Sequence, residues 1–86
     1  MDMTDLLEIE REESRLSVDA RSAIRKGFHP RHEIVKLVEE APTGTICEIH
    51  VPHRTGPLIN ALQDGGRHVA VSEIEPGHWR LRVLKL

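Results

Sequence analysis

Two segments of the chain alternate apolar and polar side chains with the period of two that a half-buried β-strand requires. The first covers residues 15–21 and the second covers residues 45–51. We expect a strand in each segment, with its apolar side facing a core. The apolar members are Leu16, Val18, Ala20, Cys47, Ile49 and Val51.

Each of these strands is followed by a segment with apolar residues at helical spacing. The first predicted helix begins at Pro30, a residue suited to the first turn, and ends at Pro42 and the turn after it. The second begins at Thr55, a residue type that caps helices, with Pro57 in its first turn. The apolar stripes consist of Ile34, Leu37, Val38 and Ala41, and of Leu58, Ile59 and Leu62.

The end of the chain predicts two more strands, at 68–74 and 79–84, around a Pro-Gly turn. The element order is therefore β-α-β-α-β-β. Right-handed crossovers make the first two strands parallel and place both helices on one face. We expect an α+β fold, an α/β two-layer sandwich with a four-stranded mixed sheet whose other face is open. The open face would carry Ser17, Asp19, Glu48, His50, Arg80 and Arg82.

The first 14 residues are acidic and hold few branched aliphatic side chains, namely Leu6, Leu7 and Ile9. We predict a flexible N-terminal arm over residues 1–14 and a single domain over residues 15–86. The alternative is a helix or extended segment that packs on the domain or on a second chain.

Composition narrows the class of protein. The 86 residues are 30% charged and 38% hydrophobic with a net charge of −2, which is typical of one globular domain. The negative charge and the two aromatic residues, Phe28 and Trp79, argue against nucleic acid as a ligand. No long apolar run predicts a membrane span, and the acidic N-terminus and single cysteine, Cys47, favour the cytoplasm.

Two His-x-x-His motifs lie where predicted strands pass into helices: His29 with His32, and His50 with His53. In β-α units these positions gather at the carboxyl ends of the strands. Neutral imidazole is a common ligand of transition metals. We therefore predict that these four histidines bind a metal ion such as zinc, with His78 in reserve because an antiparallel last strand would begin at the same end.

Plainer interpretations of these residues stay open. The histidines would also fit as surface residues, with His50 pairing with Asp19 or Glu48. Thr55 and Gly56, with Arg54 beside them, would hold a small anion at a helix N-terminus, or form an ordinary cap.

Several short motifs, in their order and spacing, resemble the TusA/SirA-like fold, and most closely an uncharacterised bacterial domain-of-unknown-function branch of it. The resemblance covers residues 15–85 and implies a two-layer sandwich whose final strand is antiparallel. The sulfur carriers of this fold have a Cys-Pro-x-Pro motif at the start of the first helix, where this chain has His29 before Pro30, so persulfide relay is not transferred. The motifs are Leu16-Ser17-Val18-Asp19-Ala20-Arg21, Gly27-Phe28-His29-Pro30, Pro42-Thr43-Gly44-Thr45 and Trp79-Arg80-Leu81-Arg82-Val83.

The predicted function is a small, non-catalytic binding or carrier-like module that works through the histidine-bearing end of its sheet. The alternative is an accessory protein in sulfur transfer or redox metabolism that acts through protein contacts without a sulfur-carrying cysteine. Alternation places Cys47 in the core, where a thiol is inert. We expect a protein partner, and a monomer or weak homodimer because four strands leave two free edges.

Overall fold

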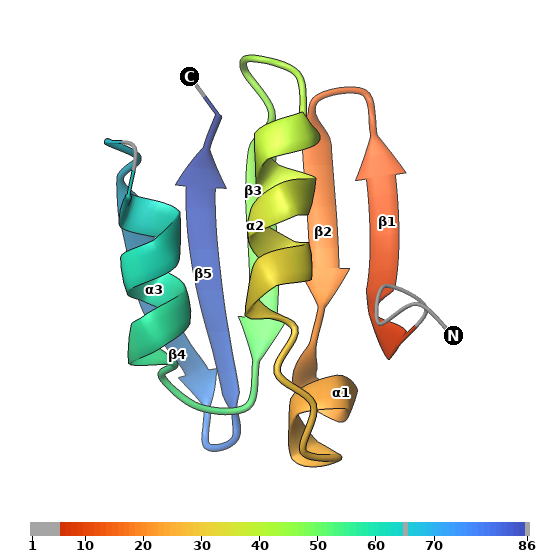
Figure 1. Cartoon of the computed structure of the whole chain (residues 1–86), viewed down its shortest axis with the longest axis vertical. Helices are drawn as coiled ribbons and strands as arrows, with labels where there is room; N and C mark the ends of the chain where they lie inside the picture. The colour runs from red at the N-terminus through yellow and green to blue at the C-terminus, as the bar shows by residue number, and fades with distance from the viewer. Residues whose placement is uncertain (1–5, 65, 86) are drawn as a thin grey trace.

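The computed structural model describes residues 6–64 and 66–85, which form an α+β two-layer sandwich (Figure 1). Helices α2 and α3 lie side by side on one face of the sheet, and α1 lies beyond the end of β2. None of the helices in these ranges is long and apolar enough to span a membrane. The elements are β1 (Glu8–Glu12), β2 (Arg15–Asp19), α1 (Arg21–Arg25), α2 (Arg31–Glu40), β3 (Ile46–Val51), α3 (Gly56–Gln63), β4 (Val69–Glu75) and β5 (His78–Leu84).

The sheet is mixed, as predicted, with the strand order β1-β2-β3-β5-β4. β2 and β3 are parallel, and every other neighbouring pair is antiparallel. Because β5 is antiparallel to β3, Trp79 at its start lies opposite Val51 at the end of β3. The carboxyl ends of β2 and β3 therefore share one end of the sheet with the β4–β5 turn.

The sheet has five strands rather than the predicted four, because Glu8–Glu12 is β1 and not part of a flexible arm. This segment pairs antiparallel with β2, with Ile9 opposite Val18. Leu7 is buried and Ile9 packs against the core, while the glutamates of β1 are exposed. Three apolar contacts, from Leu6, Leu7 and Ile9, and the free edge of β2 thus suffice to hold an edge strand. Residues 1–5 of the predicted arm lie outside the described residues.

The segment between β2 and α2, for which no element was predicted, contains the short helix α1, whose Ala23 is buried. The Arg25 guanidinium donates a hydrogen bond of 3.0 Å from Nη2 to the carbonyl oxygen of Gly77. Gly77 has a φ of 83°, which suits the tight β4–β5 turn because glycine adopts this conformation without strain. α1 is thereby attached to the turn at the same end of the sheet.

The core lies between the helix layer and the inner face of the sheet. Burying each large aliphatic side chain there contributes roughly 1.5–3 kcal/mol, which is what holds α2 and α3 on the sheet. No described helix covers the opposite face, and side chains of the other parity project from it as predicted: Ser17, Asp19, Glu48, His50, Arg80 and Arg82. The largest fully buried side chains are Ile34, Ile49, Leu62, Leu81, Val18, Val38, Val51, Val83 and Cys47.

Candidate functional site

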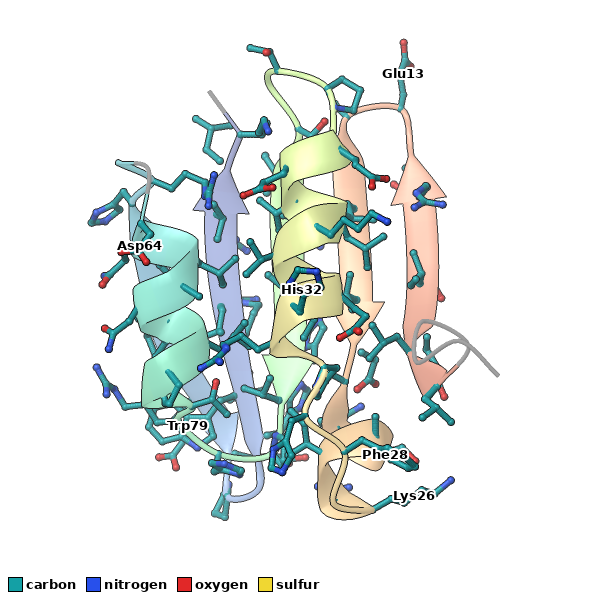
Figure 2. All side chains as sticks on the ribbon, viewed as in Figure 1. Glu13, Lys26, Phe28, His32, Asp64 and Trp79 are labelled. Carbon is teal, nitrogen blue, oxygen red and sulfur yellow. The ribbon has the colours of Figure 1, made fainter. Side chains whose placement is uncertain are left out.

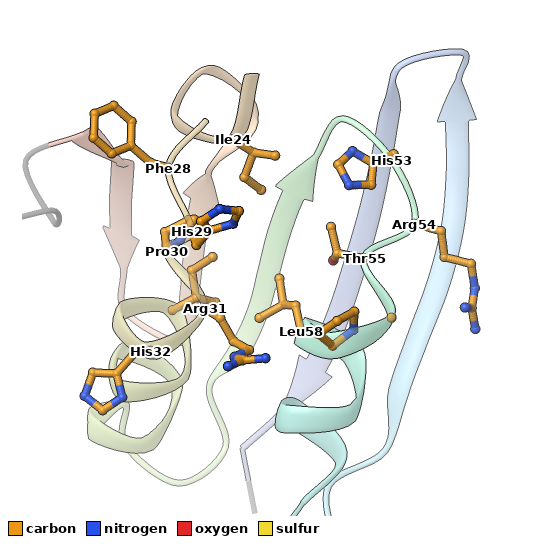
Figure 3. A pocket seen from close by; sticks show the side chains of 13 residues that line it. Ile24, Phe28, His29, Pro30, Arg31, His32, His53, Arg54, Thr55 and Leu58 are labelled. Atoms are coloured by element: carbon orange, nitrogen blue, oxygen red, sulfur yellow. The ribbon is translucent and has the colours of Figure 1, made fainter. Parts of the chain in front are cut away.

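A pocket of about 550 Å³ opens between the N-terminal ends of α2 and α3. The segment that leads into α2 and the loop that joins β3 to α3 form its walls (Figure 3). Because α2 and α3 lie side by side and run in the same direction, both helices begin at this pocket. Its lining consists of Ile24, Phe28, His29, Pro30, Arg31, His32, Ile34, His53, Arg54, Thr55, Gly56, Pro57 and Leu58.

Both helices begin here without a side-chain cap. The amide of Ile34 donates to the carbonyl of Pro30 at 2.9 Å, and the amide of Ile59 donates to the carbonyl of Thr55 at 3.0 Å. The N–H groups that precede these in each helix have no carbonyl partner within the helix. Thr55 occupies the predicted N-cap position, but its Oγ1 is buried and has no hydrogen-bond partner among the described residues. Thr55 is therefore at the predicted N-cap position, but the predicted capping hydrogen bond from its side chain is absent among the described residues.

The pocket is electropositive although the chain as a whole is acidic. Its described lining includes Arg31, Arg54 and three histidines but no Asp or Glu. The two helix N-termini add partial positive charge. Glu33, the acidic residue in the first turn of α2, is not among the lining residues. An anion in this pocket would meet favourable charge from both walls.

The lining side chains are not equally placed (Figure 3). Arg31, His29 and His53 extend toward the gap between the two helices, whereas Arg54 extends from the outer flank of the α3 side. His32 lies on the exposed face of α2, away from α3 (Figure 2). Arg31 is thus the cation best placed to reach a ligand between the helices.

His50 lies on the uncovered face of the sheet and pairs with His78. The Nδ1 atom of His50 is 2.8 Å from the Nε2 atom of His78, so one ring donates its N–H to the other. The ring centroids are 5.0 Å apart and the rings are tilted by 50°. Burial lowers the pKa of His50, and the neighbouring His78 acts in the same direction. Both effects favour a neutral His50 ring, which can supply either the donor or the acceptor nitrogen of this hydrogen bond.

The structure does not gather the predicted metal ligands into one site. His29, His32 and His53 border the pocket, with the His32 ring pointing away from α3, and His50 lies on the other face with His78. Strand alternation directs His50 away from the helices, while the chain beyond Pro52 turns toward them. Across residues 6–64 and 66–85, no group of three or more His, Cys, Asp or Glu side chains could hold a metal ion.

Asp19, a possible partner of His50 from the sequence, lies in register with His50 but forms its side-chain hydrogen bonds with Arg21. The Arg21 guanidinium donates from Nε to Oδ1 at 3.1 Å and from Nη2 to Oδ2 at 2.8 Å. These hydrogen bonds lower the pKa of Asp19. Its carboxylate therefore serves to hold the start of α1 to the end of β2.

Cys47 is fully buried on the core side of β3, as the alternation predicts. Burial raises the pKa of its thiol, so the thiol is protonated and shielded from reagents at neutral pH. This position gives the chain no exposed thiolate for sulfur chemistry.

Sequence reasoning did not single out Arg31. A detectable signal existed, because Arg31 directly follows Pro30 and so had to stand at the first turn of the predicted helix. Ile24 was not expected to line the pocket, because it lies in α1, a helix that was not predicted. Arg54, Thr55 and Gly56, which the sequence offered as a possible anion site, line the α3 side of the pocket, whereas the α2 side was not considered.

No protein-family model matches this chain, and no curated protein matches it either. The resemblance to the TusA/SirA-like sandwich therefore stays a prediction.

Proposed function

We propose that this protein is a non-catalytic binding module for a small anion with an apolar portion, held between the N-termini of α2 and α3. The observation that carries the proposal is a pocket with two uncapped helix N-termini and an inward-pointing Arg31, whose described lining has no carboxylate. Its volume of about 550 Å³ lies within the range of small-molecule sites. The proposal keeps the predicted class of function and replaces the metal ion with an anion.

The lining suggests how such a ligand would be oriented. A phosphate or carboxylate head would accept hydrogen bonds from the Arg31 guanidinium and from free N–H groups at the helix starts. His29 and His53 would flank it. The apolar portion of the ligand would contact Ile24 and Leu58.

The test uses inorganic phosphate and hexyl phosphate as probes, followed by amide shifts in two-dimensional NMR. We expect saturable shifts in residues 29–34 and 53–58, with hexyl phosphate binding at least about tenfold more tightly because its chain buries apolar surface. Shifts that are weak, linear in probe concentration or spread over the whole chain would contradict the proposal.

Two variants that lose the same charge distinguish binding at the pocket from nonspecific electrostatic attraction of the probe to the protein. Arg31→Gln should weaken hexyl phosphate binding about tenfold, since it removes a charge-assisted hydrogen bond. Arg80→Gln removes the same charge from the opposite face and should change binding by less than about twofold. Equal losses in the two variants would show that only net charge matters.

A further inference from the structure

On the uncovered face of the sheet, β1 forms an acidic column and β5 forms a basic column, and Arg15, Asp19 and Glu48 lie between them on β2 and β3. β1 contributes Glu8, Glu10 and Glu12, which are all exposed. β5 contributes Arg80 and Arg82, with β2 and β3 between the two columns. The acidic column therefore lies toward one side of the face and the basic column toward the other.

The strand registers align these columns in rows across the sheet. One row runs through Glu8, Asp19, His50, Arg80 and Ser72. The next row along the strands runs through Glu10, Ser17, Glu48, Arg82 and Ala70.

We propose that this face docks a second copy of the chain, related to the first by a twofold axis parallel to the strands between β2 and β3. Such an axis places β1 of each copy over β5 of the other, with the rows at the same level. Glu8 then faces Arg80 of the second copy, and Glu10 faces its Arg82. Each contact occurs twice because the interface is isologous. An axis perpendicular to the strands would place acidic column on acidic column, so charge selects the first arrangement.

The same face also exposes apolar surface, and this axis places Ile46 opposite Arg15 and Leu84 opposite Glu12 of the second copy, whose aliphatic stems would cover it. Ile46 and Leu84 are register partners on neighbouring strands and are 41% and 48% exposed. Under this axis four strands of each copy overlap, and with about 4.8 Å between strands and about 3.3 Å per residue they give a face of roughly 19 by 17 Å. Two such faces would bury roughly 650 Å² in total, below the size of standard specific interfaces. The expected assembly is therefore a weak dimer.

Sedimentation velocity of the full chain tests this arrangement. In low salt, at protein concentrations up to about 1 mM, the wild-type chain should form dimers, and raising the salt from about 0.01 M to about 1 M should dissociate them. Glu8→Arg should weaken the dimer about tenfold, and Arg80→Glu should do the same, because each creates two like-charge contacts. The double variant should associate within about threefold of wild type, since it restores both contacts with the charges exchanged.

The matched control is Glu39→Lys, which changes the charge by the same amount on the exposed surface of α2. It should leave the dimer within about twofold of wild type. Circular dichroism spectra establish that every variant is folded. A wild-type chain that stays monomeric at about 1 mM in low salt would overturn the proposal and leave the face to a different protein. A double variant as weak as the single variants would overturn it as well.

Discussion

Glu48 lies in the middle of the uncovered sheet face with only 4% of its surface exposed, and two arginines reach it. Arg15 forms a salt bridge to its Oε1 atom, and the Nη2 atom of Arg82 lies 4.0 Å from the same oxygen. The carboxylate is buried while the two cations are not: their side chains are 54% and 49% exposed. This difference predicts that the effect of Glu48→Gln on the free energy of unfolding depends on whether the arginines are present.

The size of each change in the free energy of unfolding depends on which charged group the substitution leaves without a partner. In the wild-type chain, Glu48→Gln releases two guanidiniums that water can solvate, so the loss is about 1 kcal/mol. Replacing both arginines with methionine keeps their apolar stems but leaves a buried carboxylate without a cation, at a cost of about 3 kcal/mol. In that double variant, Glu48→Gln removes the unpaired charge and should restore about 1–2 kcal/mol. The same substitution should therefore change sign between the two backgrounds.

Urea unfolding at pH 7, followed by circular dichroism, measures all four chains of this cycle. The m-values should stay equal, because the same surface becomes exposed on unfolding. If Glu48→Gln destabilises both backgrounds equally, the arginines are not the reason that a buried charge is tolerated on this strand. The reasoning from burial would then be refuted.

Three further predictions concern titrating side chains. Arg21 lowers the pKa of Asp19, so Asp19→Asn should cost about 0.5 kcal/mol above about pH 5, a difference that disappears as the pH falls through the lowered pKa, below the ordinary 3.8. Because burial lowers the pKa of His50, the unfolded chain protonates this ring first, and wild-type stability relative to His50→Gln should decrease as the pH falls below 6.5. Urea unfolding across pH measures both, and pH-independent differences would contradict them. Cys47→Ser should cost about 1–3 kcal/mol in urea unfolding by burying a hydroxyl, and native Cys47 should react with a thiol reagent only on unfolding.

The periodic parts of the fold could be predicted from the sequence because burial on one side imposes a period. Leu16 and Val18 in β2, and Ile49 in β3, are buried as their alternation indicates. α2 begins one residue after Pro30 and ends before Pro42, since proline tolerates the start of a helix and opposes its continuation.

β1 was predicted only as the alternative, an extended segment that packs on the domain, because the same reasoning favoured a flexible arm. Glutamates on an edge strand prevent further strands from pairing with it. In the sequence alone, the same glutamates are typical of a solvated, flexible arm. The segment is a strand because β2 has a free edge and Ile9 finds the core, which are properties of the assembled sheet. α1 has only five residues, too few for a periodic signal.

The histidines were predicted to meet at one end of the sheet, and the structure separates them between its two faces. Topology brings the ends of β2 and β3 together, yet it does not decide on which face each side chain lies. The alternation had already placed His50 on the open face, and this should have separated it from His53. The pocket between α2 and α3 depends on how closely the two helices pack, which no spacing of residues reveals.

β3 joins the two halves of the sheet. On one side it pairs with β2 of the N-terminal hairpin, and on the other with β5 of the C-terminal hairpin. Each hairpin closes through a short turn, but neither is large enough to be stable alone in water. Loss of β3 from the sheet would therefore unfold both hairpins together. The molecule should unfold as a single cooperative unit, with the amide protons of β3 exchanging only through global unfolding.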